Sequence, residues 1–145
     1  MGAVAVLALL AGIATSIQVA VLARLGTRIG LLGTIAFSSS TSALLALTIL
    51  LVVHRGLGRI GDALRQPPWL WLGGVLGIGV LLVITFAGAR LGTAATVSLL
   101  IAGQLAMGVV IDRFGLFGGE RIALNWPRAV GVVLLGAGAA LSLRR

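Results

Sequence analysis

Five apolar runs, separated by short stretches that carry almost all of the charge, dominate this sequence of 145 residues. A membrane-spanning helix needs about 20 apolar residues to cross about 30 Å of hydrocarbon, because each residue adds about 1.5 Å. The runs have about that length and lie at residues 2–23, 30–53, 69–89, 93–112 and 126–143. We therefore predict an all-α integral membrane protein, with one transmembrane domain over residues 1–145 and five transmembrane helices.

The composition supports lipid as part of the solvent. Hydrophobic residues make up 59% of the chain, charged residues only 10%, and the mean hydropathy is +1.19. A soluble domain would be about a quarter charged, and a chain this small could not bury so much apolar surface. The eleven basic residues are scattered between the runs, so we expect them to contact lipid headgroups rather than nucleic acid.

The fifth run is barely long enough to span, since its continuous apolar part covers only residues 129–143. Its start nevertheless resembles a helix start at a membrane surface. Asn125 can cap a helix whose first turn contains Pro127, and Trp126 suits the interface between lipid and water.

The arginines are almost evenly divided between the two sides of the membrane. With five spans, one side holds six of them and the other holds five: Arg55, Arg59, Arg65, Arg113, Arg121 and Arg128 against Arg24, Arg28, Arg90, Arg144 and Arg145. An excess of positive loops normally fixes the orientation, so this balance predicts that the chain inserts both ways. Dual insertion would allow an antiparallel homodimer; the alternative is a single orientation that such a count does not resolve.

Two amides interrupt the apolar runs. Gln104 lies at the middle of "LGTAATVSLLIAGQLAMGVVIDRFG", and Gln18 lies well inside the first run. Lipid offers no partner for an amide's two donors and its acceptor, so we expect both side chains to face the protein interior. They would contact a substrate near the midplane or form an interhelical hydrogen bond, such as one between Gln18 and Gln104; the two alternatives are compatible.

A cluster of hydroxyls and a pair of indoles supply the other candidates. In "FSSSTS", Ser38 and Ser42 share one helical face and could line a wet cavity, although such hydroxyls often bond back to a carbonyl one turn earlier. Trp71, like Trp69, follows two prolines and is either an interfacial anchor or an aromatic gate. The predicted substrate-binding residues are Gln18, Ser38, Ser42, Trp71 and Gln104.

Charge is missing from the centre of every run. No Asp, Glu, Lys, Arg or His lies there, which argues for a neutral, zwitterionic or amphiphilic substrate. His54 is the only histidine, there is no cysteine, and no carboxylates pair, so we predict no enzyme, no metal site and no cofactor. Asp112, beside Arg113, is interpreted as a terminal ion pair or loop tie.

At these residues the chain resembles the YdcZ-like family, small members of the drug/metabolite transporter superfamily. The resemblance rests on the opening at residues 92–96, on Gln104, on Asp112 before "RF", on "GIATSIQVAVLARLG" with Gln18, and on "PWLWLGGVLG". One departure is Leu22, where many relatives would have an asparagine; this removes a polar contact from that turn.

The resemblance implies five spans that equal half of a ten-helix transporter with two inverted halves. A half-sized chain would then pair head to tail with a second copy. We expect a small-molecule exporter of the bacterial inner membrane that works by alternating access as an antiparallel homodimer. The alternatives are a non-transporting membrane subunit and a small dual-topology channel.

Overall fold

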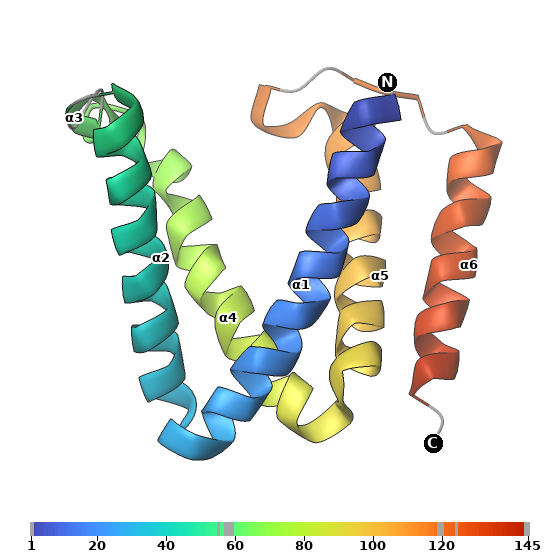
Figure 1. The fold of residues 1–145 in the computed structure, drawn as a ribbon. Helices are drawn as coiled ribbons and strands as arrows, with labels where there is room; N and C mark the ends of the chain where they lie inside the picture. The colour runs from blue at the N-terminus through green and yellow to red at the C-terminus, as the bar shows by residue number, and fades with distance from the viewer. Residues whose placement is uncertain (1, 55, 57–59, 119–120, 124, 144–145) are drawn as a thin grey trace. The chain divides into compact units, whose positions relative to one another are not determined.

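The computed structural model describes residues 2–54, 56, 60–118, 121–123 and 125–143, and every regular element in them is helical (Figure 1). This confirms the all-α prediction for the described part of the chain. The elements are α1 (Gly2–Ile29), α2 (Leu31–His54), α3 (Ile60–Ala63), η1 (Pro68–Trp71), α4 (Leu72–Leu91), α5 (Thr93–Phe114), η2 (Leu116–Gly118) and α6 (Trp126–Ser142).

Four helical segments among these residues are long and apolar enough to cross a membrane. They are Gly2–Ile29, Leu31–Val53, Pro68–Leu91 and Thr93–Phe114. α6 has 17 residues, which gives about 26 Å of helix, short of the roughly 30 Å of hydrocarbon. Five spans, a single transmembrane domain and the inverted-repeat fold therefore stay predictions.

The first helix is longer than its apolar run. The predicted run ends at residue 23, but α1 continues past two arginines to Ile29. Arginines mark where hydrocarbon ends and do not break a helix, so the end of the run does not mark the end of this helix. Only Gly30, with φ +80°, separates α1 from α2.

The two shortest connections have the same construction. Gly30 joins α1 to α2 and Gly92 joins α4 to α5, both at positive φ, a conformation that glycine adopts without steric cost. In each, a threonine four residues later donates twice to the glycine carbonyl. Thr34 does so from N at 3.1 Å and Oγ1 at 2.9 Å, and Thr96 from N at 3.2 Å and Oγ1 at 2.8 Å. These bonds satisfy polar groups that lie inside packed protein.

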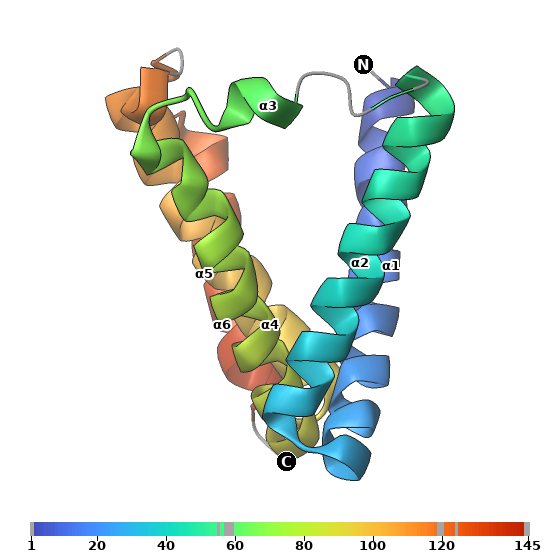
Figure 2. The same cartoon turned by 90° about the vertical axis from the view of Figure 1, so that its left-hand side faces the viewer.

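Residues 22–89 form one compact unit. Within it, the start of α2 and the end of α4 lie closer together than the ends of these helices near α3 (Figure 2). The buried residues gather at the close end: Leu22, Ala23, Thr34, Ile35, Ile84, Thr85 and Gly88. Gly26 makes the tightest approach there, because a Cβ built on it would lie 2.6 Å from Cγ2 of Thr85.

Residues 1–21 and 90–145 form the other unit, in which α5 packs against α6 and against η2. Gly115, in the left-handed conformation, ends α5 and donates its N–H to the carbonyl of Ile111. Asn125 occupies the N-cap position of α6 as expected, but its side chain makes no capping hydrogen bond. The helix starts instead on the backbone bond from Ala129 N–H to the Asn125 carbonyl, at 3.1 Å.

Candidate functional site

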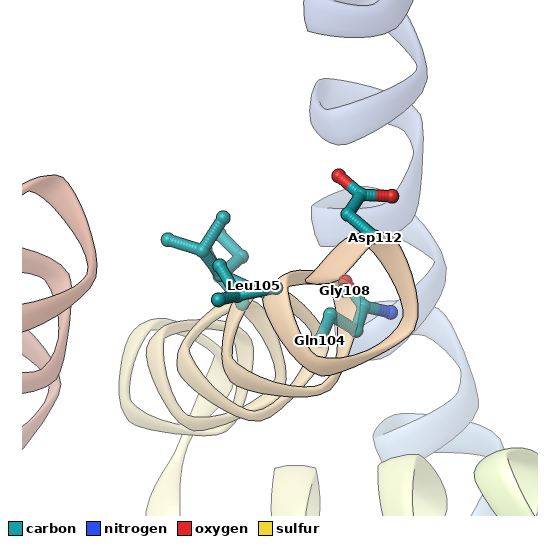
Figure 3. Close-up of a pocket in the computed structure, with 6 residues that line it drawn as sticks. Gln104, Leu105, Gly108 and Asp112 are labelled. Atoms are coloured by element: carbon teal, nitrogen blue, oxygen red, sulfur yellow. The ribbon is translucent and has the colours of Figure 1, made fainter. Parts of the chain in front are cut away.

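An open groove of about 330 Å³ runs along one face of α5 (Figure 3). The residues that line it recur at intervals of three and one, which is the spacing of a single helical face: Ile101, Gln104, Leu105, Gly108, Val109 and Asp112. The groove is open over Gly108, since a Cβ built there would meet nothing within 4 Å.

The groove has one polar group at its end, Asp112, and another, Gln104, one turn from its other end at Ile101, with apolar walls between them. Gln104 lies at the middle of α5, and Asp112 lies eight residues further, about 12 Å along the helix. Asp112 is half-buried, and its backbone carbonyl accepts the N–H of Ile122 at 2.8 Å. The predicted loop tie at Asp112 is therefore made, although by the backbone. This arrangement suits an elongated solute with a polar group at either end.

Neither mid-span amide faces the interior of the single chain. Gln104 and Gln18 are both exposed, and neither side-chain amide forms a hydrogen bond with another residue of the described chain. The predicted bond between Gln18 and Gln104 is thus absent, and the expectation of an inward orientation is not met within one chain. Acyl chains cannot satisfy an amide, so an amide that lies within the hydrocarbon needs a polar partner or a wet cavity.

The hydroxyls of α2 divide into bonded and unbonded groups. Thr34 and Thr41 each bond back to a carbonyl one turn earlier, at 2.9 Å. For Thr41, which belongs to the cluster "FSSSTS", this is the local bond that such hydroxyls often form. The hydroxyl of Ser39 is buried and has no partner. Ser38 is half-buried and Ser42 is exposed, one turn apart on the same helix. That they line a cavity stays a prediction.

Trp71 ends η1, and its indole is bonded locally. The Nε1–H donates to the carbonyl of Ala63 at 3.1 Å, which ties η1 to α3. Half of the Trp71 side chain is exposed, as is Trp69 beside it. The bond gives Trp71 a local anchoring role, and a role as a gate stays a prediction.

The sequence did not identify the groove as such, because every face of α5 is apolar and periodicity does not select one. The available signal was the register of Gln104, Gly108 and Asp112 at four-residue intervals, which places an amide, a gap and a carboxylate on one stripe. Asp112 had been interpreted only as a helix-end residue.

One of the comparisons with known proteins gives a match. A family model described as "Putative inner membrane exporter, YdcZ" matches residues 3–141. No curated protein and no solved structure matches the chain. The family description and the four membrane-length helices of the described residues make this a multi-pass protein of the inner membrane, of the transporter class. An exporter is not an enzyme class. With nearly its whole length covered by that model, the chain belongs to the YdcZ family of inner-membrane exporters.

Proposed function

We propose that the chain exports a neutral, zwitterionic or amphiphilic solute by alternating access, as an antiparallel homodimer whose copies face each other across the α5 groove. The observation that carries this proposal is the exposure of Gln18 and Gln104 at mid-span with no partner in their own chain. A second copy would cover these amides and enclose a polar chamber in the bilayer.

The low burial of the long helices also supports a missing partner. In the four membrane-length segments, the most apolar stretch is only 6% to 11% buried. Lipid covers apolar side chains well, but it gives small residues and amides nothing to pack or bond against. A helical partner can pack against the small residues and form hydrogen bonds with the amides.

Antiparallel pairing follows from the arginine balance, and it has a geometric consequence for the groove. Of the arginines counted above, Arg55, Arg59, Arg144 and Arg145 lie outside the described residues. In such a dimer the two Gln104 side chains meet near the midplane, and the two Asp112 carboxylates lie toward opposite membrane faces. A solute would pass from one carboxylate, between the amides, to the other.

We expect Gln104→Leu to weaken the binding of any transported solute about tenfold, because an amide hydrogen bond at a dry site is lost while the shape is kept. Ligands are first found by thermal shift of the purified protein against neutral, zwitterionic and amphiphilic metabolites. Met107→Leu is the matched control, on the same helix but outside the groove. A ligand whose stabilisation survives Gln104→Leu would remove Gln104 from the site.

Orientation is tested separately with engineered cysteines, since the native chain has none. Leu105 lies within about 3 Å of the midpoint of α5 along the helix axis. In an antiparallel dimer, the cysteine of Leu105→Cys can therefore form a disulfide with the same cysteine of the second copy. Asp112→Cys lies about 13 Å from that midpoint, so its two copies would be about 25 Å apart and would not form one. A parallel dimer would cross-link at both positions, and that result would contradict the proposal.

Two reporters fused to the C-terminus, one active only outside the inner membrane and one active only inside it, test in cells whether the chain inserts both ways. We expect both the reporter that works outside and the reporter that works inside to be active. Activity of only one would oppose dual insertion. Fast downhill ion flux in liposomes would instead identify a channel, and loss of the purified protein without a second component would identify a subunit.

A further inference from the structure

A second hollow, of about 420 Å³, lies where α5 ends and shares no residue with the Gln104 groove. It is lined by Arg113, Phe114, Arg121, Ile122 and Ala123. Two cationic side chains from separate segments thus border one concavity, beside apolar ones.

The backbone explains how the two arginines come together. Arg113 directly follows Asp112, and Arg121 directly precedes Ile122. The hydrogen bond from Ile122 N–H to the Asp112 carbonyl, 2.8 Å, therefore holds the two arginine positions side by side. Between them the chain turns back through two left-handed residues, Gly115 at φ +62° and Phe117 at φ +60°.

The charges of the pair are not balanced within the described chain. Arg113 and Arg121 are exposed, and neither forms an ion pair with a described carboxylate; Glu120 lies outside the described residues. Two guanidinium groups at one hollow repel each other unless an anion lies between them. The planar fork of each guanidinium matches two oxygens of a phosphate, so together they suit a phosphate oxyanion.

The position of Arg113 along α5 and the apolar residues beside the two arginines indicate the source of such a phosphate. Arg113 lies in the last turn of α5, about 14 Å from the midpoint of that helix, which is the edge of a hydrocarbon layer about 30 Å thick. Phe114 and Ile122, which are 62% and 47% exposed, flank the cations with apolar surface. A free phosphate would gain nothing from that surface, whereas a lipid carries its phosphate on an acyl-glycerol body.

We propose that Arg113 and Arg121 form a specific site for the phosphate group of an anionic membrane lipid, at the end of α5. The site is distinct from general attraction between basic loops and headgroups, because it needs both guanidinium forks in one hollow. It does not rest on the proposed transport function.

The test measures binding of dioleoylphosphatidylglycerol to the full-length protein in neutral detergent, by native mass spectrometry and by thermal shift. We expect it to bind at least about tenfold more tightly than dioleoylphosphatidylcholine, whose phosphate carries a choline cation that the two arginines repel. Arg113→Gln with Arg121→Gln should abolish that preference. Arg65→Gln is the matched control, an exposed interfacial arginine outside the hollow, and should leave the preference unchanged. Loss of the preference in Arg65→Gln as well, or its survival in the double variant, would overturn the proposal.

Two further arms separate the alternatives. Arg113→Lys with Arg121→Lys keeps the charge and removes the forks; we expect it to lose most of the preference. Full retention would indicate diffuse electrostatics and overturn the site. Inorganic phosphate should stabilise the protein far less than the lipid does, and equal stabilisation would overturn the assignment to a lipid. A circular dichroism spectrum like that of the native protein ensures that the double variants are folded.

Discussion

Replacing Gly26 with alanine is expected to lower the free energy of unfolding by about 1–3 kcal/mol, the usual cost of adding a methyl group to a filled site. The new Cβ would lie 2.6 Å from Cγ2 of Thr85, closer than real side chains approach. Thr85 has little freedom to move away. It is 2% exposed, it is β-branched, and its hydroxyl donates to the carbonyl of Leu81 at 2.8 Å. Thermal unfolding in detergent measures the effect.

A second substitution distinguishes the clash with Thr85 from a general effect of replacing a glycine. Thr85→Ser in the Gly26→Ala background removes Cγ2 and keeps the hydroxyl bond, so it should restore more than half of the lost stability. Gly33→Ala is the control, because its nearest neighbours are side-chain atoms of Ile29 at 3.6 Å or more, which is ordinary contact. A double variant no more stable than Gly26→Ala alone would contradict the clash.

Replacing Gly92 with alanine is expected to be as damaging, for a conformational reason. Its φ of 85° and ψ of 165° lie in a region that is essentially restricted to glycine, and forcing another residue there costs about 1–3 kcal/mol. If the turn relaxed to avoid this strain, the two bonds from Thr96 to the Gly92 carbonyl would be lost as well. The melting temperature of the variant should fall accordingly.

The choice of substituent sharpens this test. Asparagine tolerates the ordinary left-handed region but not the conformation of Gly92, so Gly92→Asn should destabilise as much as Gly92→Ala. At Gly115, with φ 62° and ψ 38°, asparagine should be accepted with little loss. Gly74→Ala, in open space on α4, should be neutral. Equal tolerance of asparagine at Gly92 and Gly115 would refute the argument.

Hydropathy located the helices well and their ends less well. The run at 93–112 lies inside α5, which continues to Phe114, and the run at 30–53 differs from α2 by one residue at each end. It failed at residues 24–29, where α1 continues past two arginines, because a charged residue marks the edge of the lipid and not the end of a helix. The two single-glycine turns gave no stronger signal than the many other glycines of the sequence.

The candidate site was predictable by residue type and not by orientation. An amide such as Gln104 stands out in an apolar run, and its cost in lipid points to function. Which way it faces depends on what covers it, and a single sequence does not give that surface. The pair Arg113 and Arg121 was unpredictable for another reason. A backbone bond across a loop brings them together, and no periodicity reports such a bond.

The single-glycine turns also make the two sides of the membrane unequal. If the four membrane-length helices all cross the bilayer, the turns at Gly30 and Gly92 emerge on the same side, each with a single residue between two helices. A protease added from that side would find little chain to cut at either turn, whereas the exposed, non-helical residues 64–67 and 121–123 would offer it substrate on the other side. Limited digestion of sealed vesicles would therefore report which way each molecule points, without any fused tag.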